Sequence, residues 1–267
     1  MTIAISLKAH DGVVLAADSA TTVFGTDPSG TTIGVLNVYN NANKIFNLYK
    51  GCPIGAITWG AGSIGQASIS TLAKDLRRLL MGTAPGTEDW RIDPSDYTIE
   101  EVARKVRRFM FEEKYAPIFA EAGTKPDLGI LVAGYSAGAD LAEEWLVQIA
   151  GGECPDPKPV RSREATGINW HGQIEPLTRL ILGHGTGLPQ VLAELGVPED
   201  QIGPAMQRIR ESLQVPFLPP PIPVQDAIDL ATYLVDTAVS FYRFSPGAPT
   251  VGGPTEIAAI TKHEGFR

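Results

Sequence analysis

An α+β fold, in which helices cover antiparallel sheets, is the fold class that the sequence predicts. Two observations lead to this prediction. Segments with strand-like patterns occur in adjacent pairs, and the long amphipathic helices are grouped between those pairs. A fold built on parallel strands would instead alternate strand and helix along the chain. Since no internal repeat is visible, we expect a single domain over residues 1–267.

The N-terminal segment predicts a β-hairpin. Residues 3–8 alternate large apolar side chains with small or polar ones, and Thr2 lies on the same face as the small ones. Asp11-Gly12 is typical of a tight hairpin turn. The second strand covers residues 13–18 and ends on the carboxylate of Asp18.

The next region predicts a loop, a strand pair and a helix. Residues 25–34 are rich in Gly, Thr and Asp and predict a loop. Residues 44–49 and 54–59 predict two strands, and the Gly-rich turn at 60–62 is expected to open directly into a helix. That helix is indicated by leucines at helical spacing, at positions 72, 76, 79 and 80.

A second helix is predicted to begin at a capping box formed by Thr98 and Glu101. Its basic residues, at positions 104 to 108, are more typical of a solvated face than of a docking surface. Two more strands are expected at 128–135 and 141–150.

The C-terminal part predicts helices, an insertion and a last strand. A short segment at 167–172 leads into a helix that ends near Leu180. Residues 183–222 are predicted to form an insertion that is helical around 189–214 and proline-rich thereafter. A helix over about 225–242 and a strand over 256–262 complete the chain.

Composition excludes several classes of function. The chain is 43% hydrophobic and 19% charged, which allows a sizeable core and argues against global disorder. Its formal net charge of −8 argues against nucleic acid and anionic membranes as partners. The N-terminus alternates rather than forming an apolar block, and no apolar run reaches the length of a membrane span. We therefore expect a cytoplasmic protein without a signal peptide.

The cysteines and histidines indicate no metal or cofactor. Cys52 and Cys154 are far apart and form no CxxC pattern, so both are expected to be structural thiols. The four histidines show no metal-ligand spacing such as HExxH.

Four short segments together resemble a known family. In chain order they read TIAISLK from Thr2, DGVVLAADS from Asp11, NKI from Asn43 and WGAG from Trp59. Their combination is similar to the opening of proteasome β-type subunits, a family that includes the bacterial proteins HslV and Anbu. The resemblance is dense over residues 2–75, and it is absent across roughly 183–222.

The resemblance implies a four-layer αββα sandwich, the N-terminal-nucleophile (Ntn) hydrolase fold, and self-association into a ring or an open spiral. It places the family's threonine nucleophile on Thr2, its aspartate on Asp18 and its lysine on Lys44. The backbone amide that stabilises the oxyanion falls on Gly62, with Gly60 as the near alternative. A need for an ATPase partner stays open.

These four residues also make chemical sense without the family. A threonine hydroxyl needs an adjacent base, and an N-terminal threonine carries one in its own α-amine, whose pKa is about 7.7–8. A lysine cation would favour the neutral amine, and a carboxylate would hold that lysine in place. A Gly-rich turn presents N–H groups to a developing oxyanion.

Two positions depart from the family pattern. Where many members have a serine in a Gly-Ser-Gly turn, this chain has His171, or His184 if the alignment shifts. Many members carry an Asp and a Ser before the last strand. This chain reads Ala248-Pro-Thr-Val251-Gly252-Gly253 there, so both side chains are missing.

Three functions follow from these observations. The leading hypothesis is a threonine-type hydrolase that cleaves peptide or amide bonds once Met1 is removed. The second is a catalytically silent scaffold or binding protein on the same fold. The third is a transpeptidase, in which an amine replaces water as the acceptor.

Overall fold

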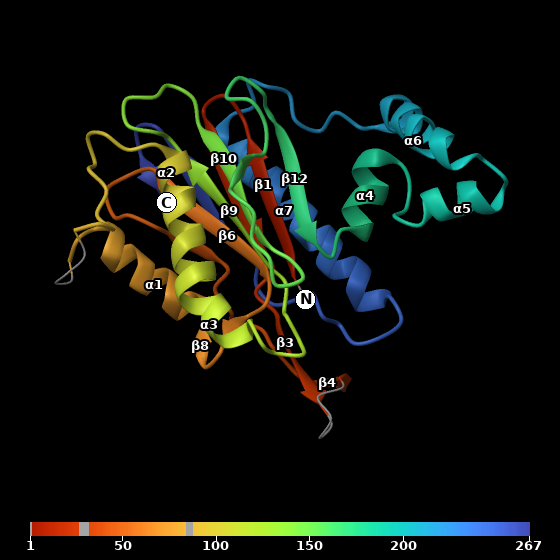
Figure 1. Cartoon of the computed structure of the whole chain (residues 1–267). Helices are drawn as coiled ribbons and strands as arrows, with labels where there is room; N and C mark the ends of the chain where they lie inside the picture. Colours follow the sequence, from red (N-terminus) through yellow and green to blue (C-terminus); the bar gives the residue numbers. More distant parts are fainter. Residues whose placement is uncertain (1, 27–31, 84–87) are drawn as a thin grey trace.

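Two five-stranded antiparallel sheets form the centre of the computed structural model, which describes residues 2–26, 32–83 and 88–267 (Figure 1). The first sheet contains, in spatial order, β12 (Gly167–Gly172), β1 (Ile3–Lys8), β2 (Gly12–Ala17), β13 (Glu256–Thr261) and β14 (Gly265–Phe266). The second contains β11 (Lys158–Pro159), β10 (Glu143–Ile149), β9 (Leu128–Gly134), β6 (Ile54–Gly60) and β5 (Ile45–Asn47).

Helices and antiparallel strands both contribute, so the predicted α+β class is confirmed. The helices associated with the second sheet are α1 (Ile69–Leu80), α2 (Ile99–Arg107), the π-helical segment η1 (Arg108–Tyr115) and α3 (Ala116–Phe119). Those associated with the first sheet are α4 (Glu175–Leu182) and α7 (Val224–Phe244). Among the described residues, no helix combines the length and apolarity needed to cross a bilayer.

Strand β1 is buried along its whole length because apolar layers contact both of its faces. Ile3, Ile5 and Leu7 pack in a cluster with α4 and α7. Ala4 belongs to a different cluster, which joins the first sheet to residues of β6 and β9 such as Ile57. The two predicted faces of this strand therefore face two different cores.

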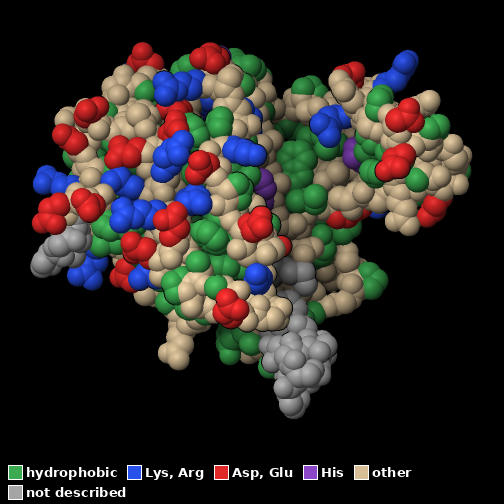
Figure 2. Space-filling view, viewed as in Figure 1, with side chains coloured by type: hydrophobic (Ala, Val, Ile, Leu, Met, Phe, Trp, Pro, Cys, Tyr) green, Lys and Arg blue, Asp and Glu red, His purple; other side chains and the backbone are tan. Residues whose placement is uncertain are grey.

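Helix α2 begins at the predicted cap, Thr98, and α1 also begins at a side-chain cap. The hydroxyl of Thr98 accepts a hydrogen bond from the backbone N–H of Glu101 at 3.0 Å, and Ser68 caps α1 in the same way through Thr71 at 3.1 Å. The basic residues of α2 are interspersed with acidic ones (Figure 2), and Arg104 pairs with Glu100 at 2.8 Å. Arg104 and Arg108 are exposed, as expected for a solvated face, whereas Lys105 and Arg107 are half-buried and donate to the backbone carbonyls of Asp89 and Cys154.

The predicted loop at 25–34 is wrong where the structure describes it. Residues on both sides of 27–31, which lie outside the described residues, form a two-stranded ribbon of β3 (Thr21–Thr26) and β4 (Thr32–Tyr39). The register shifts between Val23 and Phe24 and again between Gly25 and Thr26. Threonine and valine favour extended backbone, and such irregularities accommodate the glycines that suggested a loop.

The Gly-rich turn does not open directly into a helix. A small hairpin of β7 (Ser63–Ile64) and β8 (Ala67–Ser68) separates Gly62 from α1. The N–H of Ile69 donates to the Gly62 carbonyl at 3.0 Å, which brings the glycine back beside the start of α1. The tight turn between β7 and β8 requires a residue with a positive φ, and Gly65 has a φ of +59° there.

The region at 183–222 holds two helices, α5 (Leu188–Glu194) and α6 (Glu199–Leu213), that lie away from the sheets in Figure 1. Neither helix has a buried residue. The proline-rich part that follows returns to the body, where Phe217 and Leu218 pack against the cluster of α7. Whether the chain is one domain with an insertion stays a prediction.

Candidate active site

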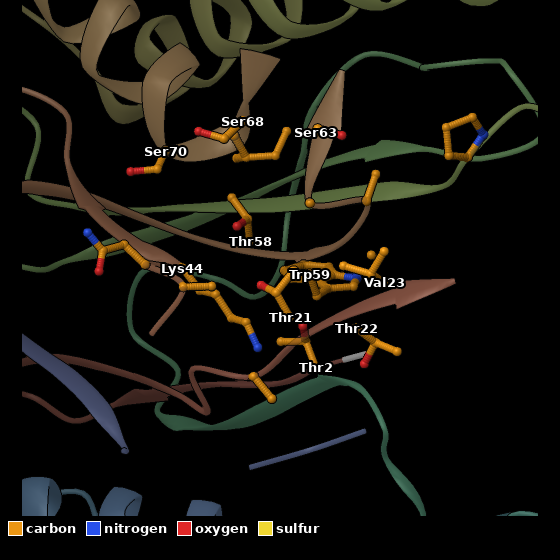
Figure 3. Close-up of a pocket in the computed structure, with 18 of the residues that line it drawn as sticks. Thr2, Thr21, Thr22, Val23, Lys44, Thr58, Trp59, Ser63, Ser68 and Ser70 are labelled. Atoms are coloured by element: carbon orange, nitrogen blue, oxygen red, sulfur yellow. The ribbon is translucent and has the colours of Figure 1, made fainter. Parts of the chain in front are cut away.

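Thr2 lies immediately before β1 and lines a cavity of about 750 Å³. Thr2 is almost fully buried, and its backbone carbonyl accepts a hydrogen bond from the N–H of Gln173 at 2.7 Å. Strand β12 thus holds the start of the chain from one side. Figure 3 shows the Thr2 side chain at the base of this cavity, with Thr21 next to it.

Gly172 allows the close approach of β12 to Thr2. A Cβ atom added at Gly172 would lie 2.0 Å from the Thr2 carbonyl oxygen, and the glycine has a φ of +84°. No larger residue fits there without moving the backbone of Thr2.

Gly172→Ala is therefore expected to lower the free energy of unfolding by about 3 kcal/mol. The matched control is Gly138→Ala, because Gly138 also has a positive φ, +70°, but nothing lies within 4 Å of its added Cβ. The control should lose only about 1 kcal/mol. Urea denaturation of both variants checks this, and equal losses would contradict the steric argument.

Asp18 and Lys44 form a buried ion pair. The Lys44 ammonium donates to Asp18 Oδ1 at 2.7 Å, and the N–H of Ile3 donates to the same oxygen at 3.0 Å. The second oxygen accepts from the N–H groups of Ala20 at 3.2 Å and Gly252 at 3.0 Å. Because Ile3 follows Thr2 directly, this shared oxygen fixes the lysine beside the start of the chain.

Burial makes Lys44 a better proton donor than a surface lysine. Desolvation lowers the pKa of its ammonium, and the nearby Asp18 carboxylate opposes this effect only in part. In Figure 3 the Lys44 amine points toward Thr2, and both residues line the cavity. A lysine held in this way can give up and take back a proton close to the Thr2 hydroxyl.

Glu256 holds the backbone of Lys44, a contact that the sequence did not indicate. Its carboxylate accepts hydrogen bonds from the N–H groups of Lys44 at 2.7 Å and Ile45 at 3.3 Å. Burial raises the pKa of Glu256, whereas these two hydrogen bonds lower it. The first residue of β13 therefore positions the lysine at the entrance to β5.

The backbone of β6 directs the N–H of Gly60 into the cavity. The N–H of Thr58 donates to the Lys44 carbonyl at 3.0 Å, on the β5 side of the strand, and the N–H of Ala61 donates to Asp127 at 2.9 Å, on the β9 side. Because N–H directions alternate along a strand, Gly60 points the same way as Thr58. Strand β5 does not extend that far, and Gly60 lines the cavity.

His171 is one of the two histidines that could match the family's serine. It lies in β12, opposite Ala4, whereas His184 follows α4 and bonds to Gly185. The imidazole of His171 stacks on the indole of Trp59 with 4.0 Å between ring centroids. Its buried Nε2 has no hydrogen-bond partner among the described residues, and desolvation lowers the pKa of the ring to about 4.

This lowered pKa predicts a pH dependence of stability. An unfolded histidine takes up a proton below about pH 6.5, whereas the folded His171 stays neutral down to about pH 4, so lowering the pH between these values favours the unfolded chain. His171→Phe keeps an aromatic ring on Trp59 but cannot take up a proton. It should therefore remove about 2–3 kcal/mol from the fall in the free energy of unfolding on acidification.

Urea midpoints of wild type and His171→Phe, measured from pH 7 to pH 4, test this expectation. The variant should show the shallower fall in stability as the pH decreases. His263→Gln, a change at an exposed histidine, is the control. Parallel pH profiles for wild type and His171→Phe would contradict the assignment.

The stretch that lacks the expected Asp and Ser side chains still contacts the site through its backbone. Gly252 donates its N–H to Asp18, and Ser19 donates its hydroxyl to the carbonyls of Pro254 at 2.6 Å and Asn40 at 3.0 Å. Ser19 directly follows Asp18, and this adjacency was the one signal in the sequence that could have pointed to these contacts.

No metal-binding group of three or more His, Cys, Asp or Glu side chains occurs within residues 2–26, 32–83 and 88–267. Cys52 and Cys154 are buried free thiols in the cluster beneath α1 and α2.

Solved structures resemble the chain over nearly its whole length. The helical assembly of the Anbu complex from Pseudomonas aeruginosa matches with a TM-score of 0.52 and 14% identity, covering 99% of this chain and 83% of that one. The chain has an Anbu-like fold. A Gly-1 mutant of Anbu from Hyphomicrobium sp. strain MC1 matches with a TM-score of 0.50 and 16% identity, covering 98% and 88%.

Sequence comparison gives no such match. No protein family and no curated protein matches the chain. The predicted resemblance to Anbu-type proteins is therefore confirmed for the fold, and identities this low say nothing further about activity.

Proposed function

We propose that this protein is a threonine-type Ntn hydrolase with the four-layer αββα arrangement of that class, and that it cleaves peptide or amide bonds after Met1 is removed. The observation that carries the proposal is the buried Asp18–Lys44 pair, which opens onto the cavity lined by Thr2. A buried ion pair is costly to desolvate, and such pairs are common where a site needs a perturbed lysine.

The reaction begins when removal of Met1 frees the α-amine of Thr2. The Thr2 hydroxyl attacks the substrate carbonyl carbon, and its proton passes to the α-amine, with Lys44 as the neighbouring proton carrier. The tetrahedral intermediate then expels the amine leaving group, which takes that proton. This leaves an ester between Thr2 and the acyl part of the substrate, and water hydrolyses it to regenerate the hydroxyl.

Each remaining group has one role. Asp18 holds the Lys44 ammonium in place, and Gly252 together with Ala20 holds Asp18. The oxyanion is stabilised by a backbone N–H, and we assign this role to Gly60 rather than Gly62. The direction of the Gly60 N–H, derived from its neighbours along β6, supports this choice.

Intact-mass analysis and labelling test the proposal together. Protein purified from cells is expected to lack Met1, and a peptide epoxyketone, which reacts with a free N-terminal threonine, is expected to label Thr2. Peptide mapping locates the label. Retention of Met1 with no label on Thr2 would refute the hydrolase.

The silent scaffold is favoured by a specific observation, the absence of the Asp and Ser side chains before the last strand. This stretch still lies against the site, because the Gly252 N–H donates to Asp18 and the Ser19 hydroxyl donates to the Pro254 carbonyl. The transpeptidase is tested by mass spectrometry of the products formed with an added amine. An amide product indicates transfer to the amine, and a carboxylic acid indicates hydrolysis.

We further propose that copies associate into a ring or an open spiral. The similar fold from Pseudomonas aeruginosa forms a helical assembly, and this supports the proposal. Sedimentation velocity over a range of concentrations measures it, and a monomer at all concentrations would exclude it.

A further inference from the structure

We infer that the cavity beside Thr2 selects substrates with an uncharged, hydrogen-bonding side chain, such as glutamine or asparagine, on the acyl side of the cleaved amide. This inference rests on the proposed hydrolase function, because it names the substrate class of the same site. It is carried by the cavity's charge balance and by the hydroxyl groups that line it.

The described side chains that line the cavity offer no free counter-ion to a charged substrate side chain. Lys44 is the one charged residue among the described residues that line it, and its ammonium is already paired with Asp18. An acidic or basic side chain entering the cavity would lose water without gaining a free partner of opposite charge. Charged residues are therefore disfavoured at this subsite.

The lining is rich in hydroxyl groups that have no partner of their own. Within the described residues, the side chains of Thr21, Thr58, Ser63 and Ser70 make no hydrogen bond, whereas Ser68 is used to cap α1. The buried hydroxyl of Thr22 also lacks a partner. In Figure 3, Thr21 lies next to Thr2, whereas Thr58 and the labelled serines lie above them in the view, across the cavity.

These unpartnered hydroxyls favour a side chain that both donates and accepts hydrogen bonds. An aliphatic side chain would cover the hydroxyls and leave them unsatisfied, and a site of this kind discriminates strongly against such analogues. The indole of Trp59 supplies an apolar wall, and Ala20, Ala42 and Ala61 leave room beside it. A carboxamide on a short aliphatic stem fits both surfaces, since the stem contacts Trp59 and the amide reaches the hydroxyls.

Four peptide epoxyketones that are identical except for Gln, Leu, Lys or Glu next to the warhead test the inference on the full-length protein. The second-order rate of labelling Thr2, followed by intact mass, is the readout. The glutamine probe is expected to react about 10-fold faster than the leucine probe and about 100-fold faster than the two charged probes.

Thr58→Val tests the hydroxyl contribution directly. Valine has nearly the shape of threonine and favours a strand, so it removes one hydroxyl from the cavity while β6 is retained. The ratio of glutamine to leucine labelling rates should fall by about 5-fold. Thr237→Val on α7, outside the cavity, should leave the ratio unchanged, and Ser63→Ala provides a second cavity variant should Thr58→Val fold poorly.

The outcomes separate the two proposals. Labelling of Thr2 that is fastest with the leucine, lysine or glutamate probe would overturn the substrate class and leave the nucleophile standing. A ratio unaffected by both Thr58→Val and Ser63→Ala would also overturn it. No labelling of Thr2 by any of the four probes would refute the hydrolase itself and, with it, this inference.

Discussion

Thr2→Ala is expected to lower kcat/KM for every amide substrate by at least about 1,000-fold, because in the proposed mechanism the Thr2 hydroxyl accepts the acyl part of the substrate. The side chain of Thr2 makes no hydrogen bond among the described residues, and its backbone carbonyl keeps the contact to Gln173. The loss should therefore appear in activity and not in stability. Turnover of a glutamine-containing fluorogenic peptide, together with the melting temperature, measures both.

Thr2→Ser is the matched control for this loss. Serine keeps the hydroxyl and the α-amine and removes only a methyl group, so it should retain measurable turnover and epoxyketone labelling. If Thr2→Ala were indistinguishable from wild type in every peptide and amide assay, the nucleophile assignment would be refuted and the silent-scaffold hypothesis would be supported.

Lys44→Met is expected to reduce both activity and stability. It leaves the Asp18 carboxylate buried, fully inaccessible to solvent, and without its cation. Removing one partner of such a pair costs about 3–5 kcal/mol in the free energy of unfolding. The proposed mechanism also uses Lys44 as its proton carrier, so kcat should fall by about 100-fold or more.

Two further variants separate these effects. In Lys44→Met/Asp18→Asn, the unpaired buried charge is gone, so part of the lost stability should return while activity stays low. Lys74→Met, on the exposed face of α1, should change neither quantity measurably. If the double variant were no more stable than Lys44→Met, the loss would not come from the uncompensated charge.

Local patterns were sufficient for several elements. The alternation over residues 3–8 predicts a strand whose two faces differ, and the capping box at Thr98 predicts the start of α2. Both depend on neighbours within four residues, whose geometry the backbone fixes directly. The ribbon at 21–39 was missed because its glycines and threonines suit a loop as well as an irregular hairpin.

Which partners each site residue has was decided by sheet register. Asp18 meets Gly252 across 234 positions of sequence, and Lys44 meets Glu256 across 212, because β13 pairs beside β2. The direction of the Gly60 N–H likewise depends on which side of β6 has a neighbouring strand. No spacing along the chain encodes these pairings.

By itself, the sequence predicted the α+β class, because strand periodicity is a local property, and its resemblance to proteasome β-type subunits singled out Thr2, Asp18 and Lys44 as candidates. Only the tertiary structure decided that Asp18 and Lys44 form a buried pair beside Thr2, that His171 stacks on Trp59, and that unpartnered hydroxyls line the cavity. The reason is that burial, desolvation and hydrogen-bond satisfaction depend on segments brought together from distant parts of the chain.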